Sequence, residues 1–255
     1  MAKIITLTTD FGEKDYSVGA VKGVILSINP EVKIIDITHQ LQPFDLISAA
    51  FTLKNVYSYF PAGTIHLVVV DPGVGSKRKP ILTQTEKYVF VGPDNGIFSW
   101  IGEPIKKGIH LTNSKYFLNP VSPTFHARDI FAPVAAYLSL GVKIDEFGGP
   151  LKKLVGLEIP KIQFRENKLT GEIIRVDNFG NLITNIQPEN VKKGFRTIKI
   201  KGKKILSISR TFSNTPEGKI LAYRGSAGFL EIGVNQGSAA KKLKAKIGEK
   251  VEITL

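Results

Sequence analysis

The spacing of apolar residues changes near Pro160, and this change constrains the fold of the 255-residue chain more than any other feature. Before it, strand-like apolar runs alternate with stretches in which apolar residues recur every three or four positions. After it, the helical spacing is lost, and short β-rich runs follow one another with turn residues between them. The pattern predicts two domains of different class, at 1–162 and 168–255.

The first half has the order of a βαβ fold. Strands are expected at 3–9, 32–38, 64–70 and 88–91, and helices at 17–29, 45–59 and 129–140. The run at 64–70 is the strongest strand prediction, because its apolar character suits the middle of a parallel sheet. We therefore expect a Rossmann-like, layered α/β domain with a mainly parallel sheet and right-handed crossovers.

The second half contains only strand signals. They fall at 171–176, 182–186, 197–200, 205–209, 220–223, 229–234 and 250–254. Turn residues separate the runs, most clearly at 177–181 and 201–203. Many short strands with frequent turns predict a small antiparallel β-barrel or sandwich domain at the C-terminal end.

The chain contains no cysteine, which excludes disulfides, thiolate nucleophiles and cysteine-based zinc sites. Its four histidines stand singly without the spacing of a metal site, so we expect neither a metal nor a cofactor. No apolar run approaches the roughly 18–20 residues that span a bilayer, and we expect no membrane partner. The N-terminal residues lack the apolar segment of a secretion signal, which predicts a cytoplasmic protein.

The formal charge of +13 raises the question of nucleic-acid binding. Many lysines gather toward the C-terminus, for example at 201–204 and 241–246, without the interleaved aromatic residues that stack on bases. This arrangement favours a solvated basic surface and no nucleic-acid partner. A non-catalytic protein that binds nucleosides or nucleic acid is the alternative from another functional class.

Three apolar strands end at an aspartate that lies near a glycine, at Asp10, Asp71 and Asp94. The carboxyl ends of parallel strands share one edge of a sheet, where open α/β folds bind ligands. Asp and Gly also make ordinary turns, which would suffice for one strand, but three strands in register favour a site. Carboxylates suit ribose hydroxyls and cations and repel phosphate, so the pattern indicates a nucleoside that carries positive charge.

A second group of polar residues precedes the helix predicted at 129–140. His126 lies just before its N-terminus, where the helix dipole disfavours protonation and leaves a neutral imidazole that can accept a proton. A single histidine is more often structural. Its place at the sheet edge, together with Arg78 seven residues after Asp71, gives a functional interpretation equal weight.

Six motifs, in order over nearly the whole chain, carry a resemblance to a known family. They are TTDFG (8–12), DPGVG (71–75) with Arg78, PDNG (93–96), FHARDIF (125–131), DNFGN (177–181) and GSAGFLEIGVNQGSAA (225–240). On these motifs the chain resembles the S-adenosyl-L-methionine (SAM) hydroxide adenosyltransferases, or SAM hydrolases, which are relatives of fluorinating and chlorinating enzymes. The resemblance implies an N-terminal α/β domain, a C-terminal β-barrel domain and a homotrimer. Each active site would then lie between the N-domain of one subunit and the C-domain of its neighbour.

The resemblance also implies an enzyme that hydrolyses SAM to adenosine and L-methionine. Water or hydroxide would attack ribose C5′ in line, with methionine as the leaving group. Matching positions make Asp71, Arg78 and His126 the catalytic residues that activate water, and leave open which of Asp71 and His126 takes the proton.

Substrate-binding roles carry over to nine further positions. Asp10 would hold the ribose hydroxyls, and the pocket would be lined by Asp15, Ser17 and Phe44. Asp177 resembles the carboxylate that meets the methionine ammonium. The adenosine-binding groups of the barrel domain correspond to Asn181, Ser226, Glu231 and the backbone of Val234.

Three departures separate the chain from the halogenating relatives. Asp71 begins a DPGVG turn where they have Tyr-Pro-Ala-Thr-Gly, and His126-Ala127 stands where they have Tyr-Ser, so the serine that contacts halide is absent. These changes favour hydrolysis over a halogenase-type adenosyl transfer, which is the alternative within enzymes. Ala127 also replaces a glycine that is commoner among hydrolases. Ala227 stands where halogenating relatives have an arginine, so the contact with the methionine carboxylate is unassigned.

Overall fold

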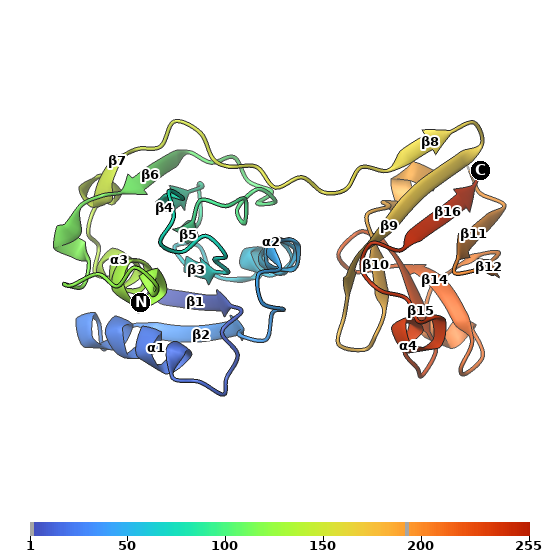
Figure 1. Cartoon of the computed structure of the whole chain (residues 1–255), viewed down its shortest axis with the longest axis horizontal. Coiled ribbons are helices and arrows are strands. Elements are labelled where there is room, and N and C mark those ends of the chain that lie inside the picture. Colours follow the sequence, from blue (N-terminus) through green and yellow to red (C-terminus); the bar gives the residue numbers. More distant parts are fainter. Residues whose placement is uncertain (1–2, 192–193) are drawn as a thin grey trace. The chain divides into compact units, whose positions relative to one another are not determined.

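The computed structural model describes residues 3–191 and 194–255. They divide into two compact units, Met1–Leu157 and Glu158–Leu255, each built on its own sheet (Figure 1). The described residues contain few helices and many strands, so the protein is of the mixed α/β class. Within the described ranges, no helix has the length and apolar character that a membrane crossing requires.

The sheet of the first unit has the strand order β2-β1-β3-β5-β4-β6-β7. Its strands are β1 (Ile4–Thr9), β2 (Lys33–Thr38), β3 (Ile65–Val69), β4 (Pro80–Gln84), β5 (Val89–Pro93), β6 (Lys107–Leu111) and β7 (Gly148–Pro150). The neighbours β2, β1, β3 and β5 are parallel, as predicted. The strands β4, β6 and β7 pair antiparallel, so the prediction of a mainly parallel sheet holds for the half that carries the aspartate motifs.

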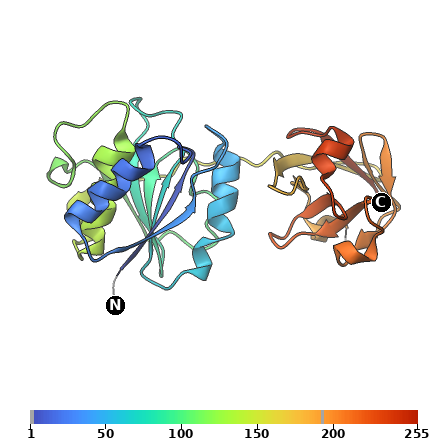
Figure 2. The same ribbon diagram turned by 90° about the horizontal axis from the view of Figure 1, so that it is seen from below.

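Helices cover both faces of this sheet, α1 and α3 on one side and α2 on the other (Figure 2). They are α1 (Ser17–Ile28), α2 (Leu46–Lys54) and α3 (Ala132–Ser139). In β3, Leu67 and Val69 pack into the cluster with α1 and α3, while Val68 and the following Val70 pack into the cluster with α2. Burial on both faces explains why this strand has no polar alternation.

Two of the helices are shorter than the sequence predicts. The helix expected at 45–59 is α2, which begins after Asp45, because the Asp45 carboxylate accepts a hydrogen bond from the Ser48 N–H at 2.9 Å. It ends at Lys54, and a separate 3₁₀ turn follows at Tyr57–Tyr59. The helix expected at 129–140 is α3, preceded by a wider π-helical turn at Ala127–Phe131.

The second unit is a nearly barrel-shaped sheet with the order β12-β11-β16-β9-β10-β15-β14-β13, with β8 also paired to β9. Its strands are β8 (Gln163–Arg165), β9 (Lys168–Val176), β10 (Leu182–Thr184), β11 (Thr197–Ile200), β12 (Lys203–Ile205), β13 (Ile208–Ser209), β14 (Ile220–Arg224), β15 (Leu230–Val234) and β16 (Lys250–Thr254). Among the described residues, neighbouring strands of this sheet pair antiparallel except β13 with β14, which are parallel. Alternate residues of the strands, such as Leu169, Ile173 and Ile253, form its buried core.

The second unit also contains elements that the sequence pattern does not indicate. A short helix, α4 (Ala239–Leu243), begins after Ser238, whose side chain accepts a hydrogen bond from the Lys241 N–H. Ala239 and Leu243 are buried in the same core as the strands.

The predicted turn at 201–203 is the hairpin that joins β11 to β12.

Candidate active site

Asp10 and Asp71 follow parallel strands and lie at the same edge of the first sheet. Asp10 comes directly after β1, and Asp71 follows β3. Both line a cavity of about 230 Å³. The wall of this cavity consists of Asp10, Phe11, Pro43, Phe44, Val69, Asp71, Val74, Thr124, Phe125, His126 and Ala127.

Asp94 does not join this cavity, which corrects the prediction of three functional aspartates. It lies at the end of β5, also at the carboxyl edge, but it is only 7% exposed and its Oδ1 accepts a hydrogen bond from the Val155 N–H at 2.9 Å. Its carboxylate therefore fixes the chain near 155. The ordinary interpretation, an aspartate that organises a loop, applies here.

Asp71, Arg78 and His126 are in direct contact. Arg78 Nε donates to Asp71 Oδ1 at 2.9 Å, and Arg78 Nη2 donates to Asp71 Oδ2. The same Nη2 lies 2.9 Å from Nδ1 of His126. The side chains of Arg78 and Asp71 are 8% and 6% exposed, and the guanidinium lies over the Phe131 ring, 5.3 Å from its centre. The structure thus brings together the three residues that the sequence predicts to be catalytic.

The loop after β3 approaches the segment before His126 because of Gly75. This residue has φ +76°, and a Cβ atom there would lie 2.6 Å from the carbonyl oxygen of Pro123. Any larger residue would push the two segments apart. The close approach brings the loop that carries Asp71 and Arg78 beside His126.

A proline follows the π-helical turn after His126. Pro133 has no N–H to donate to the Asp129 carbonyl, and Leu118 N–H donates to that carbonyl at 2.8 Å instead. The wide turn starts directly after His126, which has helical backbone angles. Such turns occur often at functional sites.

Burial lowers the pKa of His126, and the neighbouring Arg78 lowers it further, against the opposing effects of Asp71 and Asp129. The sequence predicts the direction of this shift but attributes it to the helix dipole. Burial also raises the pKa of Asp10, against the hydrogen bond that its Oδ2 accepts from the Phe44 N–H at 2.9 Å.

Asp15 and Ser17, two other predicted pocket residues, do not line the cavity. Asp15 Oδ1 accepts a hydrogen bond from the Tyr16 N–H at 2.6 Å, and Ser17 is the first residue of α1. Their neighbour Tyr16 contacts the cavity wall, since its ring meets that of Phe125 edge-on at 6.3 Å between centres. Their predicted role in binding stays a prediction.

The second unit carries a hollow of its own, of about 560 Å³. All five residues that the sequence predicts in this domain lie in its wall. The wall consists of Asp177, Phe179, Asn181, Phe212, Tyr223, Ser226, Glu231, Val234, Asn235, Gln236 and Gly237. The wall also contains three aromatic residues that were not predicted from the sequence, Phe179, Phe212 and Tyr223.

Hydrogen bonds fix the two carboxylates of this hollow. Asp177 accepts from the N–H groups of Phe179 and Asn181 and from the Asn181 side-chain amide, at 2.8–2.9 Å. Glu231 is 8% exposed and accepts from the Tyr223 hydroxyl at 2.6 Å. Burial raises the pKa of Glu231, and it also raises that of Tyr223. A Cβ at Gly225 would lie 1.8 Å from Glu231 Oε1, so only glycine leaves room for this carboxylate.

Comparison with protein families gives two matches that together cover most of the chain. Residues 5–148 match the SAM hydroxide adenosyltransferase N-terminal domain, and residues 171–252 match the C-terminal domain of the same name. The chain belongs to the SAM hydroxide adenosyltransferase family. This confirms the family predicted from the six motifs.

Individual members and relatives of this family match along almost their full length. The (R)-S-adenosyl-L-methionine hydrolase of Thermus thermophilus is 38% identical over 96% of this chain and 97% of its own. A fluorinase of Nocardia brasiliensis is a more distant relative, 25% identical over 98% of this chain and 96% of its own. An uncharacterized conserved protein from Thermotoga maritima has a crystal structure with a TM-score of 0.89, at 38% identity, and the match covers 98% of this chain and all of that one.

Proposed function

We propose that this chain hydrolyses SAM to adenosine and L-methionine. The contact of Asp71 and His126 with Arg78 at the wall of the first cavity is the observation that carries this proposal. The relative from Thermus thermophilus, which the chain matches over nearly its whole length, supports the substrate by its name.

In the hydrolysis of SAM, the group that needs activation is the nucleophile, water. Water attacks ribose C5′ while the C5′–S bond breaks and its electron pair goes to sulfur, so methionine leaves as a neutral thioether. Such a leaving group needs neither an acid nor a cofactor. The weak partner is water, which must lose a proton, and a positioned base contributes typically about 10²–10⁴-fold to such a step. Water and C5′ held in a near-attack geometry supply a further part of the rate.

The geometry divides the roles of Asp71 and His126. A guanidinium can only donate, so Arg78 Nη2, 2.9 Å from His126 Nδ1, requires this nitrogen to accept. The neutral ring then carries its hydrogen on Nε2, which donates to the oxygen of water and cannot take its proton. Each Asp71 oxygen accepts one hydrogen bond from Arg78 and keeps a further lone pair. We therefore assign the proton to Asp71 and the orientation of water to His126.

We further propose that the substrate is bound by both cavities, the one in the first unit and the hollow in the second unit. In the first, Asp10 binds the ribose hydroxyls and Phe44 packs against the nucleoside. In the second, Asp177 binds the methionine ammonium, and the adenosine is bound by Asn181, Ser226, Glu231 and the backbone of Val234. The family resemblance supports a homotrimer, with the first cavity of one copy and the second cavity of a neighbouring copy forming one site.

Halogenase-type adenosyl transfer is the second candidate, since a fluorinase is among the relatives. The sequence at the cavity wall favours water, because Asp71 and His126 replace a halide pocket and Ala127 supplies no hydroxyl. Incubation with SAM should release adenosine and methionine in equal amounts, with or without added chloride or fluoride. A 5′-halo-adenosine, or the absence of any nucleoside product, would contradict the proposal.

A further inference from the structure

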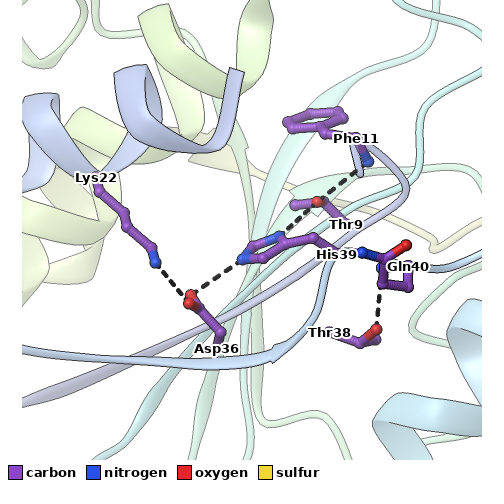
Figure 3. Close-up of polar contacts among 7 residues, drawn as sticks. All are labelled: Thr9, Phe11, Lys22, Asp36, Thr38, His39 and Gln40. Carbon is purple, nitrogen blue, oxygen red and sulfur yellow. Dashed lines mark hydrogen bonds and ion pairs between the residues drawn. The ribbon is translucent and has the colours of Figure 1, made fainter. Parts of the chain in front are cut away.

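A chain of polar contacts ties α1 and β2 to the turn that follows β1 (Figure 3). Lys22 Nζ lies 2.5 Å from Asp36 Oδ2, and Asp36 Oδ1 lies 3.0 Å from Nε2 of His39. The other ring nitrogen, Nδ1, lies 2.8 Å from the hydroxyl oxygen of Thr9. This oxygen accepts a hydrogen bond from the Phe11 N–H at 3.3 Å. The contacts thus run from the surface of α1 to a backbone amide of the turn.

The inner part of this chain is buried and its hydrogens can be assigned. His39 and Thr9 are each 2% exposed. Burial pushes the pKa of Asp36 upward, but hydrogen bonds from Lys22 and His39 outweigh it and lower the pKa overall. Thr9 Oγ1 already accepts from the Phe11 N–H, and its own hydrogen can be donated to His39 Nδ1. This arrangement leaves the ring hydrogen on Nε2, the nitrogen that lies 3.0 Å from Asp36 Oδ1.

His39 holds the turn at a second point through its backbone. Its carbonyl accepts a hydrogen bond from the Gly12 N–H at 2.8 Å. His39 therefore fixes two amides of the turn: that of Gly12 directly, and that of Phe11 through Thr9. They lie immediately after Asp10, whose carboxylate faces the first cavity. The backbone that aims the Asp10 side chain is therefore held from the His39 side.

The same turn also determines a second part of the cavity wall. Asp10 Oδ2 accepts the hydrogen bond from the Phe44 N–H, and Phe44 has φ +68°, a conformation that costs free energy in a residue other than glycine. A displaced Asp10 would release Phe44 from this conformation. None of Thr9, Asp36 and His39 lines the cavity, so any effect they have on the ligand passes through the turn.

We propose that His39 is a positioning residue for the nucleoside site. Through Thr9 and through the Gly12 amide it fixes the turn that places Asp10 at the cavity, and thereby sets the affinity for the nucleoside part of the substrate. The identity of that substrate rests on the proposed function, whereas the control of the turn does not.

Two matched pairs of variants separate this role from simple stabilisation. Thr9→Val keeps the shape of the side chain and removes the hydroxyl, while Thr9→Ser keeps the hydroxyl. His39→Gln retains a donor for Asp36 in place of Nε2 and loses the contact with Thr9. His39→Asn retains an acceptor for Thr9 in place of Nδ1 and loses Asp36. Of the two side-chain contacts of His39, the one with Thr9 leads to the turn, so Thr9→Ser and His39→Asn are the rescuing members of the pairs.

Thr85→Val is the control outside the site. Thr85 is also buried, and its hydroxyl oxygen accepts from the N–H groups of Lys87 and Tyr88 at 3.3 and 3.0 Å. It lies in the turn between β4 and β5, at the opposite edge of the sheet from Asp71. Thr85→Val removes hydrogen bonds from backbone N–H groups to a buried threonine hydroxyl, as Thr9→Val does. Thr85 does not line the cavity.

The measurements are the KM and kcat for SAM, adenosine binding by calorimetry, and hydrogen exchange at the amides of Phe11 and Gly12. Thr9→Val and His39→Gln should raise KM and the adenosine Kd by about three- to tenfold, the factor for one hydrogen bond, with a smaller change in kcat. Exchange at Phe11 should accelerate in these two variants. The rescuing variants and Thr85→Val should stay near the parent protein in all these quantities, even where their melting temperatures fall.

Equal KM and exchange in all five variants would overturn the inference, as would a rise in KM for Thr85→Val as large as that for Thr9→Val. Faster exchange at Phe11 without any change in ligand affinity would also overturn it, because the turn would then not control the site. If the parent protein releases no adenosine from SAM, the proposed hydrolysis fails. The exchange rates and adenosine binding still decide the role of His39.

Discussion

The guanidinium of Arg78 meets the carboxylate of Asp71 with two parallel donors, and both side chains are less than a tenth exposed. A buried ion pair is maintained only while both partners are present, because removal of one leaves the other charge buried and unpaired. The pair must therefore be treated as one unit, in which the two donors of Arg78 fix the orientation of the Asp71 carboxylate. His126 joins this unit through its Nδ1 contact with the same guanidinium nitrogen.

The division of roles predicts unequal effects at the two proton-handling positions. Asp71→Asn removes the group that takes the proton, and should lower kcat by about 10²–10⁴-fold. His126→Gln keeps a donor near the position of Nε2 and should lose less, about tenfold. Steady-state kinetics measure both, with Asp145→Asn as the control, because Asp145 is 69% exposed in an ion pair with Lys107. Thermal unfolding verifies that Asp71→Asn is folded. A greater loss in His126→Gln than in Asp71→Asn would contradict the assignment.

The pH dependence of turnover should follow the protonation of His126. The contact with Arg78 needs a neutral ring, and the pKa of His126 lies below its ordinary value near 6.5 because of burial and then of Arg78. Activity should therefore be full at neutral pH and fall as the pH drops below the ordinary histidine pKa, near 6.5, toward the lower pKa of His126. A pH profile of kcat measures this, and His126→Gln should lose that acid limb. A limb that survives in the variant would point to Asp10, whose pKa burial raises.

In the second unit, Tyr223→Phe should weaken substrate binding. The hydroxyl of Tyr223 donates to Glu231, and its loss leaves a buried carboxyl group without this partner. We expect KM to rise about three- to tenfold with little change in kcat. Tyr59→Phe serves as the matched control, since Tyr59 is 85% exposed. An unchanged KM in Tyr223→Phe would show that the second hollow does not hold the substrate.

Stability should fall with acid because of His66. This residue is fully buried in β3, where Thr6 Oγ1 lies 2.8 Å from its Nδ1, and burial lowers its pKa to about 4. The unfolded chain binds a proton near pH 6.5 and the folded chain only near 4, so stability is lost as the pH falls between these values. The expected loss is up to about 3 kcal/mol. His66→Phe should flatten this slope in denaturant unfolding at pH 7 and 5. An unchanged slope would contradict the account.

The parallel half of the first sheet could be predicted because apolar runs and their terminal aspartates are local features. The strand β4 could not, since only Ile81 and Leu82 in its sequence PILTQ are apolar and its pairing with β5 depends on a turn rather than on its own pattern. For the same reason, the sequence could not show that Asp94 lies outside the cavity. Its place at the sheet edge follows from sequence, whereas the Val155 N–H that occupies its carboxylate comes from a segment about sixty positions away.

The motifs predicted the acidic and polar site residues but not their supports. Tyr223 pairs with Glu231 across the register of β14 and β15, and register is not visible in a single sequence. Similarly, the lowered pKa of His126 followed from its position before a helix in the sequence analysis. The structure attributes it first to burial and then to Arg78, a residue 48 positions earlier.

The most direct test of water attack at ribose C5′ is the fate of the oxygen atom. SAM is incubated with the protein in ¹⁸O water, and the adenosine is analysed by mass spectrometry for label at its 5′-hydroxyl. Attack of water at C5′ should place one ¹⁸O atom in each adenosine at that position, and Asp71→Asn should lose the labelled product. Unlabelled adenosine, or no adenosine, would contradict it.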